Sequence, residues 1–223
     1  MGEVYKMNIA GCERELPICP LNEHMDIAGF VMFSDVEITE RAAQALLEKC
    51  PEHDVIVTAE SKGIPLAYEM ARIGCRNYVV ARKGIKAYME DPIHVEVKSI
   101  TTDHVQKLYL SKADCENLKD KRILIVDDVI STGESLHAVE ELVNKAGGII
   151  AGRMAVLAEG DAYDRKDIIT LAKLPLFNAD GSVATDSETD KTITNANAIL
   201  SKVTYRYIDS APGAEVTTYR TTR

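Results

Sequence analysis

The stretch ILIVDDVISTGES, residues 123 to 135, decides the fold of this chain. An aliphatic run is followed by two acids and then by a run of hydroxyl and glycine residues. The aliphatic run predicts a buried strand over 122–126, and the polar run predicts a helix that begins near Ser135. Two acids at the carboxyl end of a strand stand where open α/β sheets bind their ligands.

The residues after the two acids suit a phosphate group. The start of a helix offers free N–H groups and the positive end of the helix dipole, and both favour an anion. Ser131, Thr132 and Ser135 add hydroxyl donors, while Gly133 lets the backbone approach the phosphate oxygens. Carboxylates beside a bound phosphate suit a ligand that also carries hydroxyl groups. Phosphorylated ribose is such a ligand.

Three other interpretations of this stretch compete with a phosphate site. An ordinary strand, turn and helix with a capping serine explains one hydroxyl, but not two acids followed by several small residues. A response-regulator receiver also has two acids after an aliphatic strand, but its pair ends the first strand, and here the pair follows 126 residues of chain. A P-loop nucleotide-binding protein needs G-x-x-x-x-G-K-[ST], which this sequence lacks.

The chain on either side predicts a parallel sheet. A helix is expected over 35–49, and a strand over 55–59 is followed by a tight loop over 60–63. Pro65 suits the first turn of the next helix, and another strand is expected over 78–81. After the quoted stretch, Gly147 and Gly148 end the second unit's helix, and a strand follows over 149–159. Two strand–helix–strand units indicate an α/β fold with a mostly parallel sheet.

Length and composition restrict the class of protein. The 223 residues, 46% of them hydrophobic, fit one large domain or a domain with a small appendage. A net charge of −9 argues against a nucleic-acid or anionic-membrane binder. The five cysteines form no C-x-x-C pair, which predicts reduced thiols and no zinc site. No apolar run approaches the ~20 residues of a membrane span, so we expect a soluble cytoplasmic protein.

The quoted stretch resembles the phosphoribosyl-pyrophosphate (PRPP) signature of type I phosphoribosyltransferases. It has the same hydrophobic strand, two acids, two intervening residues and S/T-T-G-x-S/T run. The stretches AESKGIPLAYEMA and VVARKG resemble the purine branch, the adenine and xanthine enzymes, over roughly residues 25 to 160. The resemblance implies the fold of that family, with a parallel sheet flanked by helices, a small hood and a flexible lid loop.

The resemblance assigns roles to individual residues. Asp127 and Asp128 would bind the ribose hydroxyls and carry the catalytic charge. The 5′-phosphate would be held by Ser131, Thr132, Gly133, Glu134 and Ser135. The diphosphate would be met by Glu60, Ser61, Lys62, Gly63, Arg82, Lys83 and Lys86. Mg²⁺ would enter with PRPP and need few protein ligands, so we assign no metal-binding residue.

The identity of the acceptor base rests on a weaker pattern. Oxopurine enzymes of the family commonly place a lysine after the strand that follows the phosphate loop, where it donates to the 6-oxo group. Here that position carries the acceptors Glu159 and Asp161, and no lysine occurs before Lys166. Glu159 therefore predicts adenine, and Phe30, in the expected hood, could either stack on the ring or belong to the core. Thr101, Thr102 and Asp103 occupy the lid position where adenine enzymes carry a glutamate, and xanthine enzymes have a similar stretch there. The resemblance therefore leaves the general acid/base and the base open, with a xanthine or hypoxanthine/guanine enzyme as the alternative.

The resemblance also divides the chain. We expect a hood segment and first helix over 1–53, a phosphoribosyltransferase core over 54–175 with its lid at about 84–107, and an extension over 176–223 of open role. A homodimer is expected. Some repressors use this fold only to sense PRPP, but the segment before Val55 is too short and too acidic for their DNA-binding module. We therefore predict a purine-salvage enzyme without nucleic-acid or membrane partners.

Overall fold

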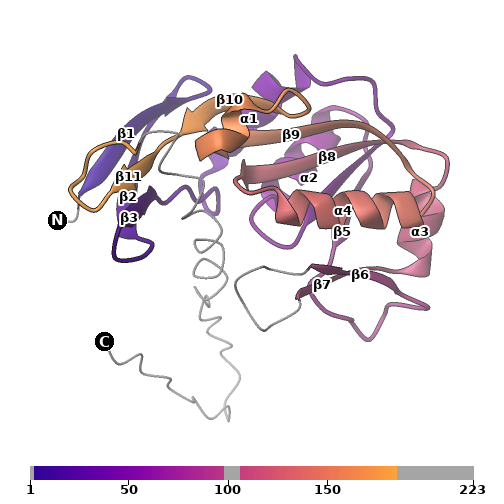
Figure 1. Cartoon of the computed structure of the whole chain (residues 1–223). Coiled ribbons are helices and arrows are strands. Elements are labelled where there is room, and N and C mark those ends of the chain that lie inside the picture. The colour runs from indigo at the N-terminus through magenta and orange to yellow at the C-terminus, as the bar shows by residue number, and fades with distance from the viewer. Residues whose placement is uncertain (1–2, 98–105, 185–223) are drawn as a thin grey trace, which may run out of the picture.

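The computed structural model describes residues 3–97 and 106–184, drawn in colour in Figure 1. These residues form a five-stranded sheet, a four-stranded sheet and a two-stranded hairpin. The five-stranded sheet carries the core, and the four-stranded sheet stands at one end of it as the hood (Figure 1). The predicted α/β class, with a parallel sheet flanked by helices, is confirmed.

The core sheet is built from strands β4 (Val55–Ala59), β5 (Tyr78–Ala81), β8 (Arg122–Ile130), β9 (Ile149–Glu159) and β10 (Ile169–Leu174). Their order is β10-β9-β8-β4-β5, and all four pairings are parallel. Every residue of β4 is buried, and so is most of β8. Near-continuous burial is typical of parallel strands that are covered on both faces.

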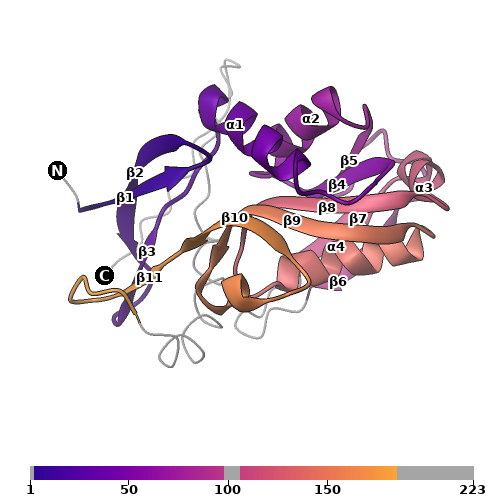
Figure 2. The same ribbon diagram turned by 90° about the horizontal axis from the view of Figure 1, so that it is seen from above.

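Helices cover both faces of this sheet (Figure 2). Helices α1 (Val36–Leu47) and α2 (Ile64–Ile73) pack together on one face, and α4 (Glu134–Lys145) packs on the other. The first helix was predicted over 35–49 but ends at Leu47. Lys49 lies beyond its end and is exposed. The helix predicted to begin near Ser135 begins at Glu134, and its side chains Leu136, Val139, Leu142 and Val143 are all buried.

Strand β8 runs four residues past the end predicted for it, to Ile130. Its last residues continue the ladder with β9, where Val129 pairs with Leu157 and Ile130 with Ala158. The acid pair therefore lies within the paired strand and not in the loop behind it. This pairing holds both carboxylates on a rigid backbone.

The hood joins distant parts of the chain. Strands β1 (Val4–Ile9), β2 (Cys12–Pro20) and β3 (Met25–Ala28) form an antiparallel sheet that is completed by β11 (Leu176–Asn178). Residues 176–178, predicted as the start of an extension, thus contribute a hood strand paired with β3. The division of the chain at residues 53 and 175 stays a prediction.

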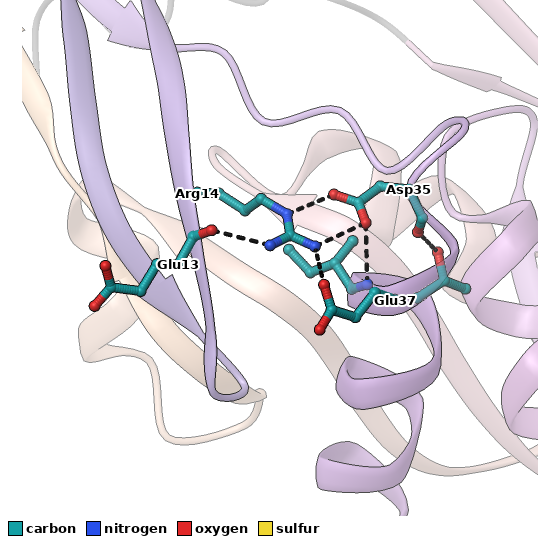
Figure 3. A network of polar contacts seen from close by, with 6 residues as sticks. Glu13, Arg14, Asp35 and Glu37 are labelled. Atoms are coloured by element: carbon teal, nitrogen blue, oxygen red, sulfur yellow. Dashed lines mark hydrogen bonds and ion pairs between the residues drawn. The ribbon is translucent and has the colours of Figure 1, made fainter.

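A network of charged side chains joins the hood to the core (Figure 3). The guanidinium of Arg14, on β2, donates from Nε to Asp35 Oδ2 over 2.7 Å and from Nη2 to Glu37 Oε2 over 2.9 Å. Asp35 also caps α1, because its Oδ1 accepts the N–H of Ile38. Arg14 lowers the pKa of Asp35 below its ordinary value, so the carboxylate stays ionised where it caps the helix.

The segment between β5 and α3 (Lys112–Leu118) contains the predicted hairpin. Strands β6 (Ile93–Val97) and β7 (Gln106–Leu110) pair antiparallel, and they pack beside α4. The predicted lid, about residues 84–107, therefore includes β6 and the start of β7, and Val95 and Leu108 of this hairpin are buried in the core on that face. Thr101, Thr102 and Asp103 lie outside the described residues.

The order of the strands determines where a ligand can bind. The chain leaves β4 toward β5 on one side and leaves β8 toward β9 on the other, so the strand order reverses between β4 and β8. Loops that diverge from such a point leave a crevice at the carboxyl ends of the strands.

Among the residues that the structure describes, every helix is too short or too polar to cross a lipid bilayer.

Candidate active site

The acid pair lies at the carboxyl end of β8, next to this crevice. Neighbouring residues of a strand point to opposite faces, so Asp127 and Asp128 have different surroundings. Asp128 is 4% exposed, whereas Asp127 is half-buried. The N–H of Asp128 donates to Asp127 Oδ1 over 2.9 Å, which fixes the first carboxylate against the strand.

The ionisation of Asp127 depends on its burial and on its charged neighbours. Burial raises the pKa of Asp127 well above its ordinary value, and the charge of Asp128 raises it further. The ammonium group of Lys62 opposes this rise with a smaller effect. A ligand that donates hydroxyl hydrogen bonds, or that develops positive charge nearby, therefore stabilises the ionised form of Asp127.

The loop between β4 and α2 reaches across to the acid pair. Lys62 Nζ lies 2.9 Å from Asp128 Oδ2, so a loop cation and a strand carboxylate form an ion pair at the crevice. Gly63 permits this approach, because a Cβ at its position would lie 2.4 Å from Thr58 Oγ1 and 3.0 Å from Asp127 Oδ1. The Glu60–Ser61 peptide bond of this loop is cis.

The loop between β8 and α4 forms the other wall of the crevice. Gly133, the residue before α4, has a φ of 85° and gives the helix no side-chain cap. Thr132 Oγ1 accepts the N–H of Glu134 only over 3.5 Å. The first turn of α4 thus presents backbone donors and the positive end of its dipole, an arrangement suited to a phosphate.

Glu159 ends β9 beside the acid pair. Its side chain is buried and has no hydrogen bond to another described residue. Burial raises the pKa of this carboxyl to about 7, and the charge of Lys62 opposes the rise. Glu159 therefore ends the strand next to β8 at the carboxyl edge of the sheet, and its contact with a base stays a prediction.

The structure brings Arg165 to the phosphate loop, which the sequence pattern did not predict. A Cβ on Gly133 would lie 2.6 Å from Arg165 Nη1. Arg165 follows the short 3-10 helix η1 (Gly160–Asp164), far along the chain from the loop that it touches. No sequence signal marks such a contact, because it depends on how the chain folds back after β9.

The sequence matches the phosphoribosyl transferase domain family over residues 33–175. The chain belongs to this family. It is 34% identical over 134 residues to a hypoxanthine/guanine phosphoribosyltransferase of Methanothermococcus okinawensis, a match that covers 56% of this chain and 68% of that protein. It is also 28% identical over 114 residues to a probable purine biosynthesis transcriptional regulator of Streptococcus pneumoniae, a match that covers 51% of this chain and 40% of the regulator.

The fold of this phosphoribosyltransferase is also found among solved structures. The adenine phosphoribosyltransferase of Thermoanaerobacter pseudethanolicus superposes with a TM-score of 0.55 at 21% identity, covering 77% of this chain and 96% of that one. Together with the family match, this similarity confirms the type I phosphoribosyltransferase fold and the predicted resemblance to the purine branch.

The predicted diphosphate residues of this phosphoribosyltransferase fall into two groups. Lys62 and Gly63 lie at the acid pair. Glu60 turns toward the end of β5, where its Oε2 accepts the N–H of Lys83 over 2.8 Å and its Oε1 lies 3.4 Å from Arg82 Nη2. Glu60 thus connects the loop to the neighbouring strand. Diphosphate contact by Glu60 and Arg82 stays a prediction.

The remaining predicted residues lie further from the acid pair or at the surface. Phe30 is 5% exposed and packs in the core with Met32 and Leu46, so its ring is not presented to a base. Ser61 and Lys83 are exposed, and Lys86 is half-buried. The burial of Phe30 follows from its place between β3 and α1, where the hood meets the main core.

Proposed function

We propose that this chain transfers a phosphoribosyl group from PRPP to a purine base, with adenine as the preferred acceptor. One observation carries the proposal: the Asp127–Asp128 pair, bound by Lys62, lies between two βα loops where the strand order reverses. The carboxylates suit the ribose, and the uncapped start of α4 suits the 5′-phosphate. Membership of the family gives the same reaction class.

The chemistry follows from where charge develops. The bond from ribose C1 to the diphosphate oxygen breaks, a bond from C1 to a purine nitrogen forms, and that nitrogen releases its proton. The products are a nucleoside 5′-monophosphate and pyrophosphate. Positive charge grows on the ribose, where Asp127 and Asp128 stabilise it electrostatically. Negative charge grows on the leaving diphosphate, toward which we assign Lys62.

We expect Mg²⁺ to enter as part of the substrate complex. Among the described residues, no group of three or more His, Cys, Asp or Glu side chains is placed to hold a metal ion. The oxygen-rich diphosphate and ribose are suitable ligands for a hard cation that keeps several waters. Magnesium dependence, a cytoplasmic location and a homodimer are further predictions for this phosphoribosyltransferase.

The preference for adenine rests on Glu159. In its ionised form, above its pKa of about 7, the carboxyl of Glu159 is a hydrogen-bond acceptor at the end of β9, and a 6-amino group is a donor. Lys62, the cation near it, is engaged 2.9 Å from Asp128. Lys166, the next lysine along the chain, is exposed. A site built around one hydrogen-bond pattern rejects the opposite pattern strongly, because polar groups would be buried unpaired.

A hypoxanthine or guanine acceptor is the second candidate. The archaeal relative at 34% identity carries that name, which favours an oxopurine. The two candidates present opposite hydrogen-bond patterns: adenine donates from its 6-amino group and accepts at N1, whereas the oxopurines accept at O6 and donate from N1. Competition between bases therefore separates them directly.

The test supplies Mg²⁺–PRPP with adenine, hypoxanthine, guanine and xanthine at equal concentration and follows each nucleotide by chromatography. We expect AMP to form fastest. Faster formation of IMP, GMP or XMP would overturn the adenine assignment and leave phosphoribosyl transfer intact. In the Glu159→Gln variant, whose amide can donate as well as accept, we expect the advantage of adenine over hypoxanthine to shrink. An unchanged ratio would remove Glu159 from base recognition.

A regulator that binds PRPP without turnover is the remaining alternative, since one relative is a transcriptional regulator. The regulator and the enzyme predict opposite results in two assays. We expect pyrophosphate release with a purine base present and no retention of duplex DNA. Binding of PRPP and DNA without any turnover would identify a regulator.

A further inference from the structure

Within the phosphate loop, positive charge comes only from the backbone. The loop residues Ser131 to Ser135 include an acid, Glu134, and no cation. The helix dipole and the N–H groups of α4 attract an anion, but the Glu134 carboxylate in the first turn competes for the same positive end. A phosphate monoester carries close to two negative charges at neutral pH. A nearby cation outside the loop would offset this deficit.

Arg165 is placed to supply that cation. Its Nη1 lies so close to Gly133 that even a methyl group on the glycine would meet it at 2.6 Å. Gly133 is the residue at which the loop turns into α4, with a φ of 85°. The guanidinium therefore lies directly against the turn whose N–H groups face the phosphate. A guanidinium forms short, strong hydrogen bonds with phosphate oxygens.

Asp167 orients the guanidinium and leaves one end of it available. Arg165 Nε donates to Asp167 Oδ1 over 3.0 Å, and Nη2 donates to Oδ2 over 2.6 Å. This bidentate pair uses the edge of the guanidinium that faces away from the loop. Nη1, the nitrogen beside Gly133, donates to no other described residue. The side chain is 35% exposed, so a ligand can reach it.

Resting on the phosphoribosyl transfer proposed above, we infer that Arg165 is a binding residue for the 5′-phosphate of PRPP and of the nucleotide product. Asp167 is its positioning residue. Nη1 donates to a phosphate oxygen that the N–H groups at the start of α4 also bind. Gly133 has a second role in this arrangement, because any side chain there would displace the guanidinium from the phosphate.

The experiment uses ribose 5-phosphate as the probe and the neighbouring Lys166 as the matched control. Arg165→Gln and Lys166→Gln remove the same charge from adjacent positions, but Lys166 is exposed and has no contact with Gly133. Calorimetry gives the Kd of ribose 5-phosphate for the full chain and for both variants. Steady-state kinetics give KM for PRPP and for the purine base, and thermal unfolding confirms that each variant folds.

We expect Arg165→Gln to weaken ribose 5-phosphate binding at least about tenfold, as loss of a charged hydrogen bond does. KM for PRPP should rise in parallel, while KM for the base stays unchanged. Lys166→Gln should bind like the unmodified chain, and Asp167→Asn should give an intermediate loss. A structural role for Arg165 would instead raise the KM of the base as well.

Three results would overturn the inference. Arg165→Gln could bind ribose 5-phosphate as the unmodified chain does, Lys166→Gln could lose as much affinity, or both substrates could lose affinity together. If the unmodified chain bound neither ribose 5-phosphate nor PRPP, the proposed function itself would fail, and the Arg165 assignment with it. Binding of ribose 5-phosphate or PRPP by the unmodified chain therefore shows whether a negative result concerns Arg165 alone or the proposed function as a whole.

Discussion

The four α-helices of the described chain begin in two different ways. Helices α1 and α3, which do not follow a strand of the core sheet, are capped by side chains: Asp35 accepts from Ile38, and Ser111 shares a reciprocal capping box with Asp114. Helices α2 and α4, which start at the crevice, follow Gly63 and Gly133 and have no side-chain cap. The chain thus leaves without a side-chain cap the two helices that follow β4 and β8, the strands on either side of the point where the strand order reverses.

This difference separates stability from function. A side-chain cap satisfies backbone donors within the protein and stabilises the fold. A glycine start leaves those donors for another molecule and lets the loops approach the acid pair closely. Substitutions at capped starts should therefore change the free energy of unfolding, and substitutions around the glycine starts should change ligand binding and turnover.

The largest expected effect lies at the acid pair between the two glycine starts. Asp127→Asn and Asp128→Asn should each lower kcat/KM by about 10²–10³, because each removes a charge that stabilises the transition state. The measurement is steady-state kinetics with PRPP and the preferred base. Asp120→Asn, an exposed acid with a φ of 60° that Asn tolerates, is the control and should be fully active. Near-normal turnover in both site variants would remove the acid pair from the mechanism.

Glu159 should make the crevice a pH-dependent weak point of the fold. Its pKa is raised from 4.5 to about 7, so between these pH values the folded protein binds more protons than the unfolded chain. The free energy of unfolding contributed by this group therefore falls as the pH rises from 4.5 to 7, by at most about 3 kcal/mol. Its contribution is greatest below pH 4.5, where the carboxyl is neutral in both states.

Urea unfolding at pH 5 and pH 8 measures this effect. Glu159→Gln should become more stable relative to the unmodified chain as the pH rises, because the amide needs no ionisation. Glu116→Gln, at an exposed acid on α3, is the control for how removing a surface carboxylate changes the free energy of unfolding between these pH values. If the free energies of unfolding of the unmodified chain and of Glu159→Gln differed by the same amount at pH 5 and pH 8, the Glu159 carboxyl would ionise as readily in the folded protein as in water.

Gly133→Ala tests the glycine start of α4. Left-handed φ costs a residue with a Cβ about 1–2 kcal/mol, and the added methyl group would also meet Arg165. Gly11→Ala is the matched control, since its φ is 84° and no atom lies within 4 Å of the added Cβ. Both variants should lose similar stability, but only Gly133→Ala should raise KM for PRPP. If Gly133→Ala and Gly11→Ala had the same KM for PRPP, the phosphate loop would tolerate a side chain at position 133.

Ser111→Ala tests a capped start and has the smallest expected effect. Ser111 Oγ accepts the N–H of Asp114 over 3.2 Å, and loss of such a cap typically costs about 1 kcal/mol. The free energy of unfolding should fall by this amount, with kcat/KM unchanged. A loss of turnover in this variant would contradict the separation between capped and glycine starts.

Local sequence patterns predicted the core sheet closely. The bounds of β4, β5 and β9 match those expected, because Gly63, Pro65 and Gly74 mark the ends of neighbouring elements and aliphatic runs mark the strands between. The acid pair and the phosphate loop were predicted from one continuous stretch. Such features depend on residues that are near each other in sequence, so they can be predicted from a short stretch of the chain.

The features that were missed depend on distant parts of the chain. The end of β8 is set by its pairing with β9, which outweighs the polar character of Asp127 and Asp128. Glu60 turns toward Arg82 and Lys83 because β5 lies beside β4, and Arg165 reaches Gly133 only after the chain has crossed β9. The sequence left two places open for Phe30, because an aromatic ring in the hood looks the same in sequence whether it faces a ligand or the core, and the structure places it in the core.

The position of β11 has a consequence for the order of folding. Strands β1 to β3 leave the ribosome before any core strand, yet Ile27 and Asp26 on β3 pair with Leu176 and Phe177, which follow β10 after Pro175. The open edge of β3 therefore waits for its partner until the whole parallel sheet has been synthesised. Contacts of such long sequence separation close slowly. Hood closure is thus expected to be the last step of folding, and β3 the edge exposed to aggregation until then.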